Sequence, residues 1–235
     1  MNKLLVLVCF LGLDVSAACA AAGTPTAIAR EAFDLRLSGK VDEAVERLET
    51  GLAADSTQAV LHYELSRAKM FLMDFEGMQA SIERAVALAP DNADYHYFAG
   101  LASAYSLINA AHKGQKEQME RFAAMDLDEL EAALRCNPDH HDARCLLVQQ
   151  IVSLAAETGV DQNRAEEHTR ILEAKDPVMG AKARANLVPK DQRADLWETM
   201  VREHPDQWSA WYEGGAGFID EGKLDRAAAC IEKAL

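Results

Sequence analysis

The sequence predicts an all-α fold, a right-handed superhelical solenoid of antiparallel helix hairpins. The segment GKVDEA at 39–44 recurs near the other end of the chain as GKLDRA at 222–227. Helical runs are also interrupted regularly, and 34 residues separate the first two stops, Ser56 and Pro90. Further stops follow at Pro138, Pro177 and Pro205. Because a single helix hairpin cannot bury its own apolar face, a chain of such units is expected to stack them.

The stretch IERAVALAPDNADYHYFAG, residues 82–100, contains one junction between two such units. Apolar residues recur at helical spacing up to Leu88. Pro90 cannot continue that helix, because it lacks an N–H group and clashes with the preceding turn. Asp91 or Asn92 can then cap the next helix through a side-chain oxygen. The junction therefore predicts a helix that ends before Pro90 and another that begins directly after it.

The same reasoning divides residues 25–235 into about six hairpins. Their expected limits are 25–55, 57–89, 92–137, 140–175, 178–204 and 206–235. The third is longer than the others and is expected to turn at 111–114, whereas the short fifth one turns at Val188-Pro189. The sixth ends at Leu235 without the polar capping helix that solenoids usually carry. Either the chain is truncated there, or the last hairpin self-associates with another chain.

Small and large residues occupy regular places in these hairpins. In the first, Ala32 lies in the middle of a helix, Gly39 forms the turn, and Ala44 and Leu48 follow in the second helix. Comparable residues elsewhere are Ser66, Met73, Met78, Ile82, Gly100, Leu130, Ala133, Trp211, Gly215, Phe218, Gly222, Ala227 and Ile231. With the 34-residue period, this pattern resembles that of tetratricopeptide-repeat (TPR) proteins over residues 25–235.

A narrower resemblance rests on two features of the middle of the chain. These are a glycine-containing loop at 158–160 and the Asp176-Pro177 stop, which follow lengthened repeats. Both are similar to features of exported bacterial TPR proteins, to which no activity is assigned. This resemblance therefore implies a fold and an exported location, but no chemistry.

The first 22 residues have the pattern of a secretory signal peptide. Lys3 precedes an apolar run from Leu4 to Leu13 that is too short to span a membrane. Ala18-Cys19-Ala20 then fits a small-x-small cleavage site. The protein is therefore expected to be exported, either periplasmic or extracellular, with a lipid anchor at Cys19 as the alternative. No later segment of the sequence is long and apolar enough to span a bilayer.

The charge of the chain argues against one class of partner. The formal net charge is −14 at pH 7. A nucleic-acid-binding protein needs a basic face that displaces counterions from the phosphates, so no nucleic acid is expected as a ligand. Adsorption to an anionic lipid surface is disfavoured for the same reason. The acidic surface is expected to be solvated, with a mild preference for basic partners.

The first helices of the first three hairpins are expected to line the concave face of the stack. The residues that helical spacing assigns to this face are Phe33, Arg36, Tyr63, Arg67, Met70, Tyr97, Leu101 and Tyr105. Aromatic side chains mixed with arginine are typical of recognition hot spots, which indicates a peptide-binding groove. The alternative is that these side chains pack between repeats. TPR domains that bind chaperone tails use a Lys/Asn/Arg clamp, which this face lacks.

Two cysteines and two histidines lie close together in the sequence, as Cys136, His140, His141 and Cys145. Three interpretations remain open: unpaired side chains, a Cys136–Cys145 disulfide favoured by an oxidising compartment, and a zinc site. The spacing matches no common structural zinc site, so no metal is assigned. His62 and His96 occupy places where TPR helices usually bury a large apolar residue, and both are expected to be packed and hydrogen bonded.

The sequence contains no glycine-rich phosphate loop, no G-x-S-x-G and no H-E-x-x-H motif. No enzymatic activity and no cofactor are therefore expected. The repeat array and its aromatic and arginine residues favour a non-enzymatic protein- or peptide-binding scaffold or adaptor of the cell envelope. The alternative is a small-ligand-binding protein in which the lengthened third hairpin closes a pocket near Tyr105, Asn109 and His112.

Overall fold

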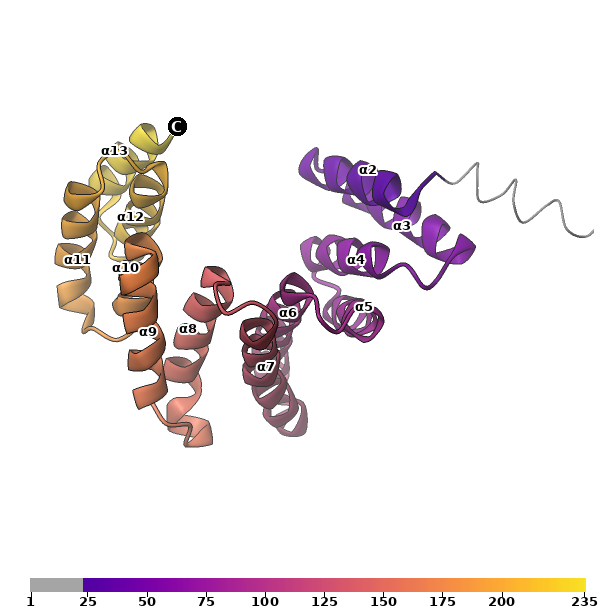
Figure 1. Ribbon diagram of the computed structural model, residues 1–235, viewed down its shortest axis with the longest axis horizontal. Helices are drawn as coiled ribbons and strands as arrows, with labels where there is room; N and C mark the ends of the chain where they lie inside the picture. Colours follow the sequence, from indigo (N-terminus) through magenta and orange to yellow (C-terminus); the bar gives the residue numbers. More distant parts are fainter. Residues whose placement is uncertain (1–22) are drawn as a thin grey trace, which may run out of the picture. The chain divides into compact units, whose positions relative to one another are not determined.

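A computed structural model describes residues 23–235, except for the side chains of residues 156–158 (Figure 1). The predicted signal peptide and the alternative lipid attachment at Cys19 fall in residues 1–22, outside the described part. Within residues 23–235 the chain forms twelve helices and no strand, which confirms the all-α prediction. In the same range, no helix has the length and apolar character needed to cross a membrane.

The helices are joined in pairs by short turns, and the six pairs follow the six expected hairpin ranges, except that α10 begins one residue before its range, at Pro177 (Figure 1). The first three pairs are α2 (Pro25–Leu37) with α3 (Val41–Ala54), α4 (Ala59–Phe71) with α5 (Phe75–Leu88), and α6 (Ala93–His112) with α7 (Lys116–Cys136). The last three are α8 (His141–Thr158) with α9 (Asn163–Lys175), α10 (Pro177–Ala185) with α11 (Lys190–Glu203), and α12 (Trp208–Asp220) with α13 (Leu224–Ala234).

The chain divides into two compact units, Met1–Phe122 and Ala123–Leu235, with the boundary inside α7. The N-terminal unit has two neighbouring apolar cores. The first contains Ile28, Ala29, Ala32, Ala44, Leu48, Leu61, Leu65 and Ala68. The second contains Met78, Ile82, Ala85, Tyr95, Phe98, Ala99 and Ala102. The alanines keep the helices close together, and the fully buried Leu48 and Ile82 supply much of the apolar area that packing removes from water.

The C-terminal unit has its largest core around Trp197 of α11, whose side chain is buried. Phe218 of α12 and Ala227 of α13 belong to the same core. Gly217 faces the Trp197 ring so closely that a Cβ atom at this position would overlap it. The glycine is therefore required by the approach of α12 to α11.

Four hairpins turn in the same way. Gly39, Gly114 and Gly222 have a positive φ, between 66° and 78°, directly after the first helix of their hairpins. In each, the N–H of the next residue donates to the carbonyl five residues back, as in a Schellman motif. The turn between α4 and α5 makes the same hydrogen bonds, but the left-handed position is held by Met73, with a φ of 53°. The sequence therefore places a side chain where the backbone favours glycine.

Four of the five junctions between hairpins are closed by a side-chain hydrogen bond of the same kind. A side-chain N–H early in one helix donates to the backbone carbonyl six residues earlier, in the loop that follows the preceding hairpin. The pairs are His62 with Ser56 at 3.0 Å, His96 with Pro90 at 2.7 Å, Arg144 with Pro138 at 2.6 Å, and Trp211 with Pro205 at 2.7 Å. His96 is buried and hydrogen bonded as predicted, whereas His62 is only half-buried. Asn92 caps α6 by accepting from the N–H of Tyr95.

Candidate functional site

The N-terminal unit carries a charged cluster on α2 and α4 that includes two of the predicted groove residues, Arg36 and Arg67. The carboxylate of Glu64 lies between them. Its Oε2 atom lies 3.4 Å from a terminal nitrogen of Arg36, and its Oε1 atom lies 3.0 Å from one of Arg67. The Arg36 and Glu64 side chains are only 5% and 10% exposed, whereas that of Arg67 is 27% exposed. One buried carboxylate therefore holds two guanidinium groups, of which Arg67 faces solvent more.

Three aromatic rings surround the two guanidinium groups. The guanidinium carbon of Arg36 lies 5.1 Å from the ring centroid of Phe33 and 5.3 Å from that of Phe71. The corresponding carbon of Arg67 lies 5.8 Å from Phe33 and 5.3 Å from Tyr63. Distances below about 6 Å are those of cation–π interactions. The rings and Glu64 together restrict the rotamers of both arginines, so the cluster is held in place before any ligand binds.

The cluster has more positive than negative charge. Burial lowers the pKa of Arg36 from its ordinary value, and the neighbouring Arg67 lowers it further, while Glu64 acts in the opposite direction. The buried Nε atom of Arg36 has no hydrogen-bond partner among residues 23–235. Burial also raises the pKa of the Tyr63 hydroxyl, so this ring stays neutral at physiological pH. Two arginines therefore share a single carboxylate in a partly dry site.

Tyr63 connects this cluster to α6. Its ring stacks on Tyr95 with centroids 4.9 Å apart and meets the edge of Phe98 at 5.5 Å. The predicted α6 residue Tyr97 is half-buried, and the α6 ring that stacks on Tyr63 is that of Tyr95. The stack connects the aromatic residues of α2 and α4 to α6. The α6 residues in it are Tyr95 and Phe98, which helical spacing had not assigned to the groove.

The remaining predicted groove residues lie in different surroundings. Met70 and Leu101 are partly buried and pack against the second apolar core of the N-terminal unit. Their position fits the alternative of packing between repeats. Tyr105 is 42% exposed, near the C-terminal end of α6. The structure therefore joins four of the eight predicted groove residues into one cluster: Phe33, Arg36, Tyr63 and Arg67.

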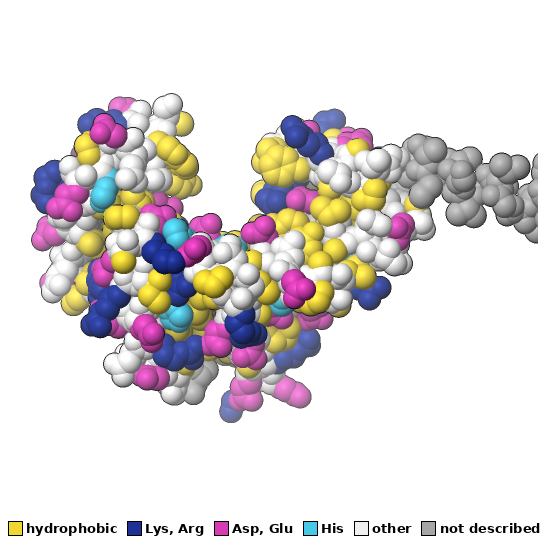
Figure 2. Space-filling model, in the orientation of Figure 1, with side chains coloured by type: hydrophobic (Ala, Val, Ile, Leu, Met, Phe, Trp, Pro, Cys, Tyr) yellow, Lys and Arg dark blue, Asp and Glu magenta, His cyan; other side chains and the backbone are white. Residues whose placement is uncertain are grey.

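Four large apolar side chains lie exposed at the C-terminal ends of α2 and α4 and in the turn that follows α4, and one of them, Phe71, contacts the cluster. They are Leu37, Phe71, Leu72 and Met73, with exposed fractions of 66%, 54%, 43% and 71%. Figure 2 shows hydrophobic and basic side chains next to one another over α2 and α4. Phe71 belongs to both groups, because its ring faces Arg36 while half of its surface is open to water. We call the cluster and these four residues the α2–α4 site.

Sequence reasoning missed Glu64, Phe71, Tyr95 and Phe98. Glu64 and Phe71 lie three residues before and four residues after Arg67 on α4, so helical spacing alone places all three on one face. That signal was available. The contact between Glu64 and Arg36 joins residues 28 positions apart and depends on how α2 packs against α4. It could not be read from the sequence of either helix.

The two histidines of the Cys/His segment make separate contacts in the structure. The Nδ1 atom of His140 accepts from the N–H of Ala143 and caps α8, while His141 Nδ1 lies 3.2 Å from an Asp176 carboxylate oxygen. Cys145 is a buried thiol whose pKa burial raises to about 12, and no Cys136–Cys145 disulfide is present. Within residues 23–235 no group of three or more His, Cys, Asp or Glu side chains could hold a metal ion.

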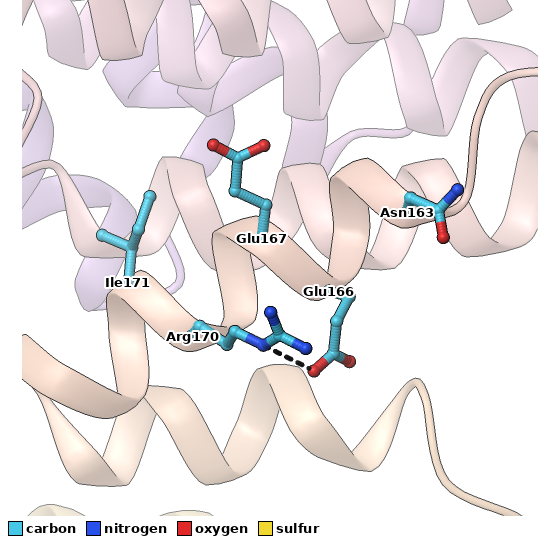
Figure 3. A pocket seen from close by; sticks show the side chains of 5 residues that line it. All are labelled: Asn163, Glu166, Glu167, Arg170 and Ile171. Atoms are coloured by element: carbon cyan, nitrogen blue, oxygen red, sulfur yellow. Dashed lines mark hydrogen bonds and ion pairs between the residues drawn. The ribbon is translucent and has the colours of Figure 1, made fainter.

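Two surface hollows lie away from the predicted small-ligand pocket. One, of about 380 Å³, is lined by residues of α9 only: Asn163, Glu166, Glu167, Arg170 and Ile171 (Figure 3). Arg170 and Glu166 are joined there by a 3.1 Å ion pair, and Glu167 points away from them. The other, of about 540 Å³, is lined by residues from Ala27 to Lys40. A wall formed by one helix does not enclose a ligand, and neither hollow includes Tyr105, Asn109 or His112.

The sequence matches no family model and no curated protein. The structure is similar to solved structures of helical-repeat proteins. TTC0263, a TPR protein of Thermus thermophilus, has a TM-score of 0.61 and 14% identity, and the match covers 83% of this chain and all of that one. Human IFIT1 bound to m7Gppp-AAAA has a TM-score of 0.53 and 14% identity, over 90% of this chain and 54% of IFIT1.

A third similar structure is that of an O-GlcNAc transferase of Thermobaculum terrenum. The TM-score is 0.50 and the identity 23%, over 68% of this chain but only 28% of the transferase. All three identities lie below 25%, so the similarity concerns the fold. Together with the twelve helices of residues 23–235, it confirms the predicted TPR-type fold.

Proposed function

We propose, from the premise that the chain has a TPR-type fold, that it is a non-enzymatic scaffold that holds a peptide segment of a partner protein on the α2–α4 site. The observation that carries this proposal is the preorganised cluster of Phe33, Arg36, Tyr63 and Arg67 with exposed Phe71 beside it. Aromatic and arginine side chains that are held rigid lose little entropy on binding, which is why they dominate interface energies.

The chemistry of the chain supports a protein or peptide rather than a nucleic acid as the ligand. IFIT1 binds m7Gppp-AAAA, so a similar fold can hold a capped RNA. The present chain has a net charge of −14, which opposes the approach of a polyanion such as RNA. The composition of the α2–α4 site suits a peptide segment, with one apolar side chain beside Phe71 and polar contacts at Arg67.

The place of action proposed for this scaffold is the cell envelope. This part of the proposal rests on the signal-peptide pattern of residues 1–22 and is independent of the site. Self-association of the last hairpin also stays a prediction, and sedimentation velocity of the purified protein tests it. Neither statement changes the residues expected to contact the ligand.

Site-specific photo-crosslinking in living cells tests the proposal. A photoreactive benzoylphenylalanine is introduced at Phe71, which is 54% exposed, in the full-length protein. The matched control carries it at Ile108 of α6, which is 53% exposed and belongs neither to the α2–α4 site nor to the last hairpin. We expect a discrete crosslinked partner from the Phe71 variant only. Crosslinks that are equal at both positions, or absent from both, contradict the proposal.

A further inference from the structure

We propose that the α2–α4 site recognises an acidic residue of the bound peptide, with Arg67 as the direct contact and Arg36 as a buried positive charge behind it. This inference rests on the proposed function, because it names the chemistry of the ligand at the same site. The ligand is a peptide carrying a carboxylate beside an apolar side chain. The geometry points to this class through charge, available donors and the apolar border of the site.

The charges of the site favour an incoming anion. Glu64 is the only carboxylate within ion-pair distance of Arg36 or Arg67 among the described residues, so the two guanidinium groups retain one net positive charge. Both Arg36 and Glu64 are almost completely buried, which weakens the screening of this charge by water. A carboxylate placed beside Arg67 completes the pairing of two arginines with two acids.

Arg67 has the donors that such a ligand needs. A guanidinium group carries five N–H donors in a fixed plane, and Glu64 accepts from only one terminal nitrogen of Arg67. The Arg67 side chain is 27% exposed, so donors remain accessible from solvent. Glu64, Phe33 and Tyr63 hold the group in position. A carboxylate can therefore accept two hydrogen bonds from a guanidinium that is already oriented.

The apolar side chains beside the arginines define the second part of the ligand. Phe71 contacts Arg36 and, like Leu37, Leu72 and Met73, is exposed to solvent. Because Phe71 lies four residues after Arg67 on the same helix, a peptide whose acidic residue meets Arg67 can bury an apolar side chain against the Phe71 ring. The neighbouring apolar surface also excludes water from the ion pair, which strengthens it. The expected ligand therefore combines an acidic and an apolar residue.

The acidic character of the whole chain does not contradict this inference. At physiological ionic strength a charge is screened over about 8 Å, so the ligand carboxylate interacts mainly with the arginines that it touches. The net charge of −14 repels a partner more strongly the more negative charges that partner carries, so it opposes highly acidic partners most. The combination selects peptides with one or two carboxylates over polyanions. Specificity then comes from the attraction of the two arginines for one carboxylate, combined with the repulsion of polyanions by the acidic surface.

The experiment uses a random dodecapeptide library displayed on phage and the full-length protein. Wild type is compared with Arg67→Gln and with Arg121→Gln, the matched control. Arg121 also has one carboxylate partner, Glu83 at 3.3 Å, and one ring, Phe122 at 5.5 Å, but it lies on α7. Selected peptides are synthesised with their acidic residue intact, with that residue changed to the amide, and with phosphoserine in its place. Dissociation constants are measured by fluorescence anisotropy.

We expect wild type and Arg121→Gln to select peptides enriched in Asp or Glu next to an apolar residue. Changing the acid to its amide, or Arg67 to Gln, should weaken binding about tenfold, and the two changes together should weaken it no further. Arg67→Lys, which keeps the charge but loses the planar fork, should give an intermediate affinity.

The contrary outcomes separate the two proposals. Peptides without acidic enrichment, or an acidic preference that survives in Arg67→Gln, overturn the recognition of a carboxylate but leave the scaffold proposal standing. Phosphoserine peptides that bind at least tenfold more tightly than the acidic ones overturn the carboxylate in favour of a phosphoryl group. If wild type selects no peptide above background, the peptide-binding function itself is refuted.

Discussion

The stability of the C-terminal unit is expected to fall as the pH rises from 4 to 8, because of Asp126 on α7. This side chain is fully buried, and neither carboxylate oxygen has a hydrogen-bond partner in the described part of the chain. Burial raises the pKa of Asp126 from 3.8 to about 8. The folded protein thus keeps a proton on this carboxyl that the unfolded chain releases above pH 4.

The sign of the effect follows from proton linkage. Between pH 4 and 8 the unfolded state binds fewer protons at this site than the folded state, so raising the pH stabilises the unfolded state. One proton corresponds to about 1.4 kcal/mol per pH unit in the free energy of unfolding. From pH 5 to pH 7 the Asp126 contribution is therefore a loss of about 3 kcal/mol. Above pH 8 both states are ionised, and the loss levels off.

Urea unfolding followed by circular dichroism at pH 5, 6, 7 and 8 measures this loss. Asp126→Asn removes the titrating group with little change in volume, and Asp128→Asn, at a more accessible position on the same helix, is the control. Other titrating groups contribute equally to all three proteins and cancel in the difference. We expect the Asp126→Asn profile to lack about 1.4 kcal/mol per pH unit of the wild-type slope. Parallel profiles of wild type and Asp126→Asn would refute the reasoning.

Three further changes test the packing. Met73→Gly should raise the free energy of unfolding by about 0.5–1 kcal/mol, because the strain that glycine removes from the left-handed backbone exceeds the entropy that it adds to the unfolded chain. Chemical denaturation measures this change, and a lower free energy of unfolding would contradict the prediction. Gly217→Ala should destabilise by about 2–3 kcal/mol, with a shift in Trp197 fluorescence, because its Cβ overlaps the ring. Arg184→Gln should lose about 1 kcal/mol by removing its ion pairs with two glutamates, and a melting temperature unchanged at low salt would count against this.

The helices could be predicted because their ends depend on local chemistry. Pro90 and Asn92 mark a stop and a cap within three residues, and Gly39 and Gly222 occupy left-handed turns. Met73, which the repeat pattern lists beside the small and large residues of the other hairpins, takes the left-handed turn position that glycine holds in the first hairpin. The backbone conformation at helix ends and turns depends mainly on residues that are adjacent in the sequence, so the sequence alone is enough to predict it.

The candidate site could be predicted only in part, because its residues meet across helices. Phe33, Arg36, Tyr63 and Arg67 share one face by spacing alone, but the ring that stacks on Tyr63 is Tyr95 rather than Tyr97. The choice between those two depends on the rotation of α6 against α4, which no local pattern determines. The burial of Asp126 was missed for a similar reason.

The hairpin junctions explain how the repeat keeps its period while its residues differ. At four of the five junctions, a loop carbonyl without a helical partner needs a donor. Four side chains supply it from six residues further on: His62, His96, Arg144 and Trp211. Imidazole, guanidinium and indole all present an N–H at the end of a long, partly apolar side chain. The structure therefore constrains the position of the donor and the length of its side chain, but not the residue type. The hairpins can keep a recognisable period although the donor residues differ from one hairpin to the next.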